Sequence, residues 1–439
     1  MDPEAAYTSL RAVAQEAVSE AELKALCQEA ATATTFGTPA PKAYIGFEPS
    51  GTAHVGWMVC TDAIRRLSAA GFEVTVLLAD WHAQINDKLG GDLAAIQRCG
   101  KYMEEAFEAL GIAPGSVTYR YANEFAKDPA YWAMVLKVAK HTTLARVRRA
   151  MTILGRAEDE SDSDLSRFFY PAMQVADIFH LGIRLAVGGM DQRHAHMLAR
   201  DVAPKLGQRA PVALHTPLVP GLKAGRMEAA EFLLANAILS KLVAAKPGVR
   251  LGAKGEPDFV FADGTGLELK RHLTDADRAG IAARFGMATK VMTPQEAGIE
   301  YGFSVDPDVE NKMSKSDPDS GIFIHDTRED ILRKLKAAHC PAKELDGNPV
   351  LDLLRLVVFP RIAAASGALR VNRPEKFGGN KAYASYPEVA ADFAAGALHP
   401  MDLKAAVADA LDQELAPVRA YFAKHPENWQ FVQALRKTR

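Results

Sequence analysis

The sequence predicts an α/β fold in which a Rossmann-like parallel sheet precedes a helical C-terminal region. The segment 42–51 is typical of a strand followed by a turn, 72–80 is a continuous apolar run typical of a strand buried on both faces, and 116–122 indicates a third strand. Helical patterns at 54–70 and 91–111 separate these strands. The order strand, helix, strand, helix, strand favours a parallel sheet with crossover helices.

The end of the first predicted strand is the expected place for chemistry. Along this strand Tyr44, Gly46 and Glu48 are predicted to point to one face, with the residues between them on the other face. Ligands of open parallel sheets bind beyond the carboxyl ends of the strands. We therefore expect a site at the turn 48–51.

Length and composition indicate a soluble globular protein of two or three domains. The chain has 439 residues, of which 48% are hydrophobic and 24% charged, and its net charge is -2. Because there is no overall basic character, contact with nucleic acid would depend on local patches. The four cysteines are too far apart for a CxxC metal site or a disulfide framework, so we expect reduced thiols and a cytoplasmic protein. No secretory signal or membrane-spanning run is visible.

Outside the sheet, the sequence indicates helices and one insertion. Residues 4–31 are predicted to be helical, and residues 127–155 are predicted to form a long helical stretch. The stretch 223–308 changes character and contains a predicted hairpin, PDFVFADGTGLELK, with a DGTG turn between β-rich flanks. The predicted division is an N-terminal helical segment 1–39, a sheet domain 40–222 with a helical connective region near 123–160, an insertion 223–308, a loop region 309–325 and a helical domain 326–439.

The residues that follow the first strand, 48–57, form the first candidate site. A helix is predicted to begin near His54, and its free N–H groups and positive dipole end would suit a phosphate. His54 in that first turn could donate a hydrogen bond to a triphosphate, and Gly46 and Gly56 would let a nucleotide approach the backbone closely. Taken alone, the segment does not exclude an ordinary joint between a strand and a helix.

The second candidate site is KMSKS at 312–316, with Lys312 and Lys315. Two lysines among small residues, followed by DPDSG, make a flexible cationic loop that could close on a leaving pyrophosphate. A lone pair of lysines at this spacing is more often a solvated basic turn.

A third group of polar residues lies on the helix predicted to begin near residue 170. Tyr170, Gln174 and Asp177 stand at positions i, i+4 and i+7 and so share one helical face. Their neighbours are apolar, and buried polar groups must find partners. Each residue alone could cross-link the fold, but three on one face favour a cavity.

Considered together, HVGW at 54–57 and KMSKS at 312–316 resemble the paired signatures of the class I aminoacyl-tRNA synthetases. The resemblance covers 40–222 and 310–435, leaves 223–308 without a counterpart, and implies a Rossmann-like catalytic domain with a C-terminal anticodon-binding domain. Within this class, six further segments resemble the archaeal and eukaryotic tyrosyl-tRNA synthetases: AYIGFEPSG, LLADWHAQIND, YPAMQVADIFHLG, AVGGMDQRHAHMLAR, NRPEKFGG and LHPMDLK.

The resemblance implies that L-tyrosine is activated with ATP to tyrosyl-adenylate and transferred to the 3′-terminal adenosine of tRNA(Tyr). In that family the residues matching Tyr170 and Gln174 hold the α-amino group of the substrate. Those matching Asp177 and Tyr44 bond the phenolic hydroxyl, and Gln192 matches a further glutamine that serves the amino acid.

An ATP site is implied as well. Neither chemical step requires a protein nucleophile, because alignment and stabilisation of phosphate charge are sufficient. Mg²⁺ is expected with the triphosphate, without a metal tightly bound by the protein. The implied ATP-binding residues are Gly46, Glu48, His54, Gly56, Lys312 and Lys315, of which His54, Lys312 and Lys315 are the expected catalytic residues.

For tRNA, the resemblance points to Arg193 near the first base pair of the acceptor stem. It also points to Phe377, His399 and Asp402 at the first anticodon base. Phe377 could equally belong to the core, and Asp402 could be an ordinary residue of a helix N-terminus. The family further implies a homodimer and no membrane partner.

Two residues depart from the pattern of the family, and three rival interpretations stay open. Trp57 stands where many class I enzymes have histidine, although its indole N–H is still a donor, and His339 stands where relatives carry an aromatic residue near the anticodon. A tryptophanyl-tRNA synthetase is disfavoured by Asp177 with Tyr44, because an indole ring has no phenol. The other rivals are an RNA-binding paralogue without activity and a small-molecule nucleotidylyltransferase, which would lack KMSKS.

Overall fold

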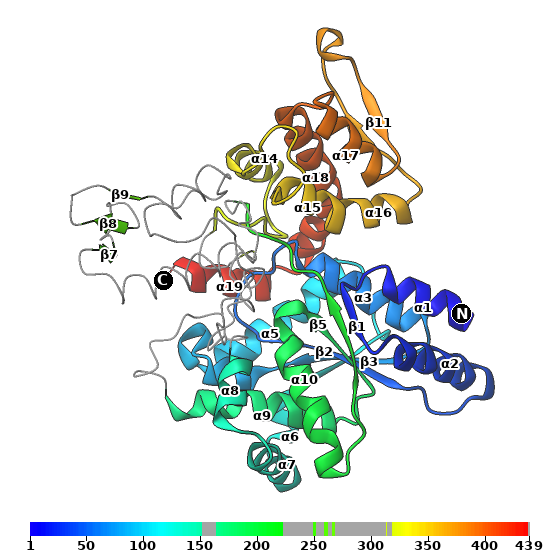
Figure 1. Cartoon of the computed structure of the whole chain (residues 1–439), viewed down its shortest axis with the longest axis vertical. Helices are drawn as coiled ribbons and strands as arrows, with labels where there is room; N and C mark the ends of the chain where they lie inside the picture. The colour runs from blue at the N-terminus through cyan, green and yellow to red at the C-terminus, as the bar shows by residue number, and fades with distance from the viewer. Residues whose placement is uncertain are drawn as a thin grey trace.

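Figure 1 shows a sheet domain, a helical domain beside it, and short strands set apart from both. Lys312, Lys315 and most of the predicted insertion lie outside the described residues. The computed structural model describes residues 1–151, 164–222, 249–251, 259–261, 266–267, 313 and 318–437.

The main sheet confirms the predicted fold class. Its strand order is β1-β6-β5-β2-β3-β4, and all neighbours are parallel except the edge strand β1, which runs antiparallel to β6. Without β1, this order is that of the Rossmann fold. The strands are β1 (Glu16–Val18), β2 (Lys42–Phe47), β3 (Glu73–Leu78), β4 (Thr118–Tyr121), β5 (Leu185–Gly189) and β6 (Val212–Thr216).

Helices cover both faces of the sheet, and β2 shows the predicted alternation. Ala43 and Ile45 are buried in a core shared with α3 and α5, whereas Tyr44 is buried in a second core shared with α7, α9 and α10. The helices of this domain are α3 (Trp57–Ala69), α4 (Asp80–Ile85), α5 (Leu93–Ala109), α6 (Ala122–Phe125), α7 (Pro129–Lys140), α8 (Leu144–Met151), α9 (Leu165–His180) and α10 (Arg193–Val202), with short 3-10 turns η1 (Lys88–Gly91), η4 (Met190–Gln192) and η5 (Ala203–Leu206).

The predicted N-terminal helical segment is confirmed in two helices, but a strand that was not predicted separates them. Helix α1 (Pro3–Arg11) is followed by strand β1, and α2 (Glu20–Phe36) begins only after it. The backbone N–H of Gln15 donates to the carbonyl of His215 at 2.8 Å, which draws this segment onto the edge of the sheet. Ser19 and Glu22 then form a capping box that starts α2.

The predicted long helix 127–155 is also interrupted. It consists of α7 and α8, and Thr143 separates them by accepting N–H groups of the following turn at its carbonyl and its side chain. A threonine at this place favours a new helix start, because its hydroxyl competes with the helix backbone for hydrogen bonds. Residues 152–155 lie outside the described part.

The C-terminal region is mostly helical, as predicted, but it also contains an unpredicted two-stranded hairpin of β10 (Leu369–Val371) and β11 (Lys381–Tyr383). The hairpin predicted in the insertion is confirmed by the antiparallel pair β8 (Phe259–Phe261) and β9 (Gly266–Leu267), next to β7 (Val249–Leu251). The C-terminal helices are α14 (Arg328–Ala337), α15 (Pro349–Leu353), the π-helix η6 (Leu354–Val358), α16 (Phe359–Ala364), α17 (Tyr386–Ala395), α18 (Pro400–Lys424) and α19 (Glu427–Lys437), with the 3-10 turn η7 (Glu375–Phe377).

A chain of contacts joins the last helix to the turn after β2. Trp429 on α19 stacks on His325 with ring centroids 3.5 Å apart, and Nε2 of His325 lies 2.9 Å from the hydroxyl of Tyr102 on α5. That hydroxyl accepts the backbone N–H of Ala53 at 3.2 Å. The C-terminal helix α19, which Figure 1 shows beside α5, is therefore packed as part of the sheet domain.

Replacing Tyr102 by phenylalanine should lower the midpoint of thermal unfolding in calorimetry. The variant leaves the buried N–H of Ala53 without its acceptor, and such a loss costs about 1–3 kcal/mol. Tyr7→Phe is the matched control, since its exposed hydroxyl donates to Glu20 and its loss should change the midpoint little. Equal midpoints for the two variants would contradict the role assigned to the Tyr102 hydroxyl.

Candidate active site

The carboxyl edge of the sheet has its switch point between β2 and β5. From β2 the sheet continues to β3 and β4 on one side, and from β5 to β6 on the other. At such a point the connections leave in opposite directions and open a crevice outside the strand ends. Gly46 is exposed there although β2 is flanked by strands on both sides. The sheet is therefore open above this residue.

The structure brings together the residues predicted to contact the amino acid. Tyr44 and Asp177 are each 1% exposed, and the pKa of the Tyr44 phenol is raised by burial and by the charge of Asp177. Gln174 acts in the opposite direction and lowers the pKa of Tyr44, and it donates from Nε2 to Oε1 of Gln192 at 3.0 Å. The pKa of Tyr170 is raised by burial, by Glu48 and, less strongly, by Asp177 and Tyr44.

Asp177 is held by two side chains that the sequence analysis did not assign. Its Oδ1 accepts the hydroxyl of Tyr131 at 2.9 Å, and its Oδ2 lies 3.2 Å from Nε2 of His82. Neither ring nitrogen of His82 makes a hydrogen bond to a described residue, so the close approach to Asp177 is a contact without hydrogen-bond geometry. The ring of His82 is edge-on to Tyr170, with centroids 4.9 Å apart.

Burial controls the ionisation of this group. It raises the pKa of Asp177 to about 8, although the hydrogen bond from Tyr131 acts against it, and the charge of Asp80 adds to it. Burial lowers the pKa of His82 to about 4. Near neutral pH, Asp177 therefore lies beside a neutral imidazole and not beside a cation.

Glu48 connects this group to the turn after β2. Asn86 donates to both of its carboxylate oxygens at 3.1 and 3.2 Å, and Nζ of Lys88 lies 3.6 Å away. Tyr170 faces the same carboxylate, which is one of the causes that raise the pKa of its phenol. Several donors from different elements hold the Glu48 side chain in one orientation.

The tautomer of His54 is fixed by the backbone. The N–H of Gly56 donates to Nδ1 at 3.2 Å, so the proton of the neutral ring is on Nε2, and Nε2 is a hydrogen-bond donor. A Cβ added at Gly56 would lie 2.7 Å from Cε1 of His54. Glycine is therefore required at this position for the ring to fold against the backbone.

The helix after this turn begins later than predicted. Helix α3 starts at Trp57, so His54 precedes the helix and does not lie in its first turn. The reason is that backbone hydrogen bonds of 2.9 and 3.1 Å hold 53–55 extended against 322–324. This pairing attaches the residues that follow KMSKS directly to the turn of the first signature.

The segment that follows KMSKS is also held by helix α14. Lys334 on α14 is 5% exposed and donates to Asp326 at 2.6 Å and to the carbonyl of Gly321 at 3.0 Å. Of KMSKS itself, Met313 is described, and its N–H donates to the carbonyl of Val219 at 3.1 Å. Met313 is therefore attached to the sheet domain, and the residues 321–326 are attached to α14.

Trp57 is a core residue. It stacks on Phe107 with ring centroids 5.0 Å apart, lies beside Phe47, and is 6% exposed. Its main contribution is therefore packing between α3 and α5. Histidine would place a polar ring in this apolar cluster, which explains why an aromatic residue suits this chain.

Arg193 and His339, two residues that the sequence analysis connected with tRNA, are both partly exposed. Arg193 begins α10 and forms a bidentate ion pair with Glu16, with Nε 2.8 Å from the nearer carboxylate oxygen. The backbone N–H of His339 donates to the carbonyl of Leu222 at 2.9 Å, at the joint between the two domains.

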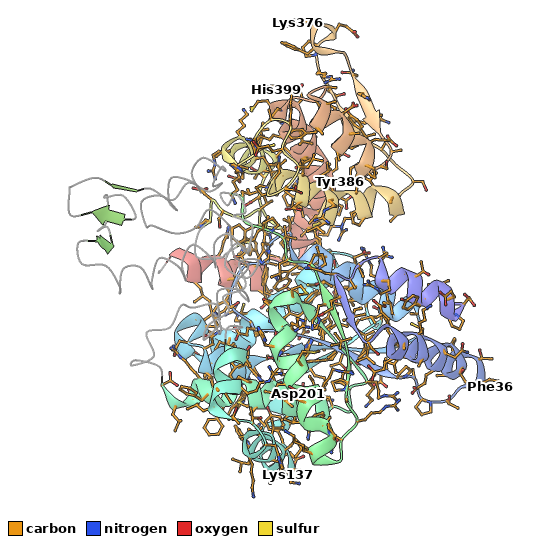
Figure 2. All side chains as sticks on the ribbon, in the orientation of Figure 1. Phe36, Lys137, Asp201, Lys376, Tyr386 and His399 are labelled. Atoms are coloured by element: carbon orange, nitrogen blue, oxygen red, sulfur yellow. The ribbon has the colours of Figure 1, made fainter. Side chains whose placement is uncertain are left out.

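The residues predicted at the anticodon lie in the C-terminal domain. Phe377 is 60% exposed in the turn between β10 and β11, so it is not a core residue, and Figure 2 shows its neighbour Lys376 at the far end of the molecule. His399 caps α18 by accepting the N–H of Met401 at Nδ1, and Asp402 lies in the first turn of that helix. The position of Asp402 in the first turn of α18 is therefore the one that the helix-terminus explanation expects, while Phe377 is exposed beside Lys376.

The described ranges contain neither a candidate metal site nor a candidate membrane span. No group of three or more histidine, cysteine, aspartate or glutamate side chains that could hold a metal ion occurs there. In the same ranges, none of the helices is both long enough and apolar enough to cross a membrane.

Comparison with known sequences identifies the class. The chain matches the family described as tRNA synthetases class I (W and Y) over residues 38–231 and 279–416. It is 38% identical over 436 residues to the tyrosine–tRNA ligase of Aeropyrum pernix, which covers 99% of this chain and 98% of that protein. It is 37% identical over 397 residues to the tyrosine–tRNA ligase of Saccharolobus solfataricus, covering 90% and 89%.

Solved structures agree with the sequence comparison. The tyrosyl-tRNA synthetase of Aeropyrum pernix superposes with a TM-score of 0.71 at 34% identity, over 100% of both chains. That of Pyrococcus horikoshii, complexed with L-tyrosine, gives a TM-score of 0.71 at 33% identity over 99% and 100%. The Rossmann order and the joined signatures are those of a class I aminoacyl-tRNA synthetase. Within this class, the chain belongs to the tyrosine–tRNA ligase family.

Asp177→Asn should change the pH dependence of stability. The folded protein binds the Asp177 proton more tightly than the unfolded chain, so the free energy of unfolding contributed by this carboxyl falls as the pH rises from 3.8 to about 8. Asparagine does not titrate, so between pH 5 and pH 8 the variant should gain stability relative to wild type by on the order of 4 kcal/mol. Urea unfolding at several pH values measures this difference.

Asp392→Asn is the control for that measurement. The pKa of Asp392 is lowered, first by the hydrogen bond from Lys381 and then by that from Tyr383, so this carboxylate is ionised throughout the range from pH 5 to pH 8. Its removal should change stability by an amount that does not vary with pH. The same constant difference for Asp177→Asn would contradict the raised pKa of Asp177.

Proposed function

We propose that this protein activates L-tyrosine with ATP to tyrosyl-adenylate and transfers the tyrosyl group to the 3′-terminal adenosine of tRNA(Tyr). The observation that carries the proposal is the buried carboxyl of Asp177 next to the Tyr44 hydroxyl at the open carboxyl edge of the sheet. The family to which the chain belongs, and the L-tyrosine bound in the Pyrococcus horikoshii relative, support it.

Asp177 and Tyr44 would select the substrate by its phenol. A phenol can both donate and accept, so it can pair with Asp177 as carboxylate or as carboxylic acid, and also with the Tyr44 hydroxyl. Phenylalanine would leave these buried groups without a partner, and an indole ring would meet them with carbon. Rejection of an analogue that lacks a hydroxyl is strongest in such sites, for which tyrosine activation is itself the standard example.

The α-amino group of tyrosine would be held by Tyr170, Gln174 and Gln192. Oε1 of Gln174 is buried without a hydrogen bond to any described residue, while its Nε2 donates to Gln192. An ammonium group has three donors and no acceptor, so it suits such an oxygen. This arrangement would leave the substrate carboxylate directed toward the side of Glu48 and His54.

ATP would lie over the exposed Gly46, between Glu48 and the turn of His54 and Gly56. The donor Nε2–H of His54 suits a phosphate oxygen, and Lys312 and Lys315 would approach from the loop that precedes the residues paired with this turn, 322–324. Mg²⁺ would enter with the triphosphate and be bound mainly by phosphate oxygens. Such a bound ion supplies charge neutralisation to the phosphates.

The reaction needs alignment more than a reactive side chain. The substrate carboxylate attacks the α-phosphorus, pyrophosphate leaves, and a ribose hydroxyl of the tRNA then takes the tyrosyl group from the adenylate. The protein would hold the reactants at bonding distance and stabilise the negative charge on the phosphate oxygens through His54, Lys312 and Lys315.

The remaining assignments concern tRNA and assembly. We assign Arg193 to the acceptor stem and the exposed Phe377, with His399 and Asp402, to the anticodon, which would make 326–439 the anticodon-binding domain and 40–222 the catalytic domain. An exposed aromatic ring is suited to stacking on an unpaired base. Homodimer formation and action in the cytoplasm are part of the same proposal.

Pyrophosphate exchange with purified protein tests the proposed function. Exchange should depend on tyrosine and should not be supported by phenylalanine or tryptophan at equal concentration, because neither has a phenol for Asp177 and Tyr44. Exchange with tryptophan would favour the rival specificity, and no exchange with any of the three would favour an inactive RNA-binding paralogue.

Gly46→Ala tests the placement of ATP. The added Cβ would meet only an ordinary contact of 3.6 Å with the Tyr44 ring, so the fold and the KM for tyrosine should be unchanged. If ATP lies against this strand, the KM for ATP in the exchange assay should rise by about tenfold. Wild-type KM values for both substrates would place ATP elsewhere.

A further inference from the structure

A line of polar side chains runs from Arg193 at the surface into the sheet domain. Glu16 on β1 accepts Nε and Nη2 of Arg193, with distances of 2.8, 3.0 and 3.1 Å. The second member of the line is His215 on β6, whose Nδ1 lies 2.9 Å from Oε2 of Glu16. Its Nε2 lies 3.1 Å from Nδ1 of His196 on α10. The ring of His196 lies 6.4 Å from that of Tyr44, centroid to centroid.

Glu16 sets the direction of every hydrogen bond in this line. Burial alone would raise its pKa, but hydrogen bonds from Arg193 and His215 lower the pKa overall, so the group is a carboxylate that only accepts. His215 must therefore carry its proton on Nδ1, which leaves Nε2 as the acceptor for Nδ1–H of His196. Burial lowers the pKa of both histidines, that of His196 to about 3, so both rings are neutral.

The orientation of the Arg193 guanidinium group follows from the edge that Glu16 binds. Glu16 occupies the edge formed by Nε and Nη2, and Nη1 makes no hydrogen bond to any described residue. A guanidinium group is planar and rigid, so anchoring one edge fixes the direction of the opposite, terminal edge. That terminal edge is the part that pairs bidentately with phosphate or with a base.

Two other ion pairs between the N-terminal segment and the sheet domain differ in this respect. Arg184 donates from both Nη1 and Nη2 to the carboxylate of Glu29, at 2.8 Å each. Arg200 donates from Nη1 to the carbonyl of Pro211 and from Nη2 to Glu22. In both pairs the arginine uses its terminal edge to link two parts of the fold. In the pair of Glu16 and Arg193, Nη1 on that edge makes no hydrogen bond to a described residue.

We propose that Glu16 is a positioning residue that aims the terminal edge of Arg193 at the acceptor end of the tRNA, and that His215 and His196 anchor Glu16 to the frame of the amino-acid site. This inference rests on the proposed function and deepens it. The edge strand β1 then has a functional role, because its pairing with β6 positions Glu16. The acceptor end and the amino acid would then be located by one connected set of side chains.

The test compares Glu16→Gln with Glu29→Gln in the full-length protein. Both changes keep the shape of the side chain and remove one charge of a bidentate ion pair, so both should lower the thermal midpoint to a similar extent. Glu16→Gln should lower kcat/KM for a tRNA(Tyr) transcript by about tenfold, as expected when a hydrogen bond to a charged group is weakened. Tyrosine-dependent pyrophosphate exchange should stay within about twofold of wild type, since exchange needs no tRNA. Glu29→Gln should leave both activities unchanged.

The double variant Glu16→Gln/Arg193→Ala shows whether Glu16 acts through Arg193. Arg193→Ala alone should lower kcat/KM for the transcript, and adding Glu16→Gln should lower it no further. An additional loss in the double variant, a wild-type kcat/KM for either single variant, or an equal fall in exchange would each overturn the proposal. Failure of the proposed function itself would appear differently, as a wild-type protein without tyrosine-dependent exchange.

Discussion

The burial of one carboxyl group, that of Asp177, constrains the rest of the site. A carboxyl removed from water must find hydrogen-bond partners or keep its proton, and here it does both, with Tyr131 as donor and a raised pKa. To surround it, α4, α7 and β2 must all converge on the face of α9 that carries it. The packing around the Asp177 carboxyl therefore also fixes the other polar residues of α9. A phenolic substrate would give this buried carboxyl a further hydrogen-bond partner.

The second constraint is the connection of distant segments at the ends of the strands. The turn after β2 is paired with 322–324, so the first signature and the residues after the second share one short backbone ladder. Tyr102, His325 and Trp429 tie the same turn to the last helix. These contacts hold the turn that carries His54 against α19 and against the segment that leads into α14.

Local patterns predicted what depends on local chemistry. Alternation along β2 gave the face of Tyr44, Gly46 and Glu48, and helical spacing grouped the polar residues of α9. Strand β1 was missed because three residues have no periodicity of their own and become a strand only by pairing with β6, although the capping box at Ser19 is a signal that a new helix starts there. His82 and Tyr131 were missed because they meet Asp177 from other helices. The late start of α3 depends on 322–324, far away in the sequence.

A structure of the protein with bound tyrosine tests the central claim most directly. The account predicts that the phenolic oxygen lies within hydrogen-bonding distance, about 2.5–3.0 Å, of both an Asp177 carboxyl oxygen and the Tyr44 hydroxyl, with the ammonium group at Oε1 of Gln174. A tyrosine whose phenol points away from Asp177, with Tyr131 and His82 unchanged around that carboxyl, would contradict it.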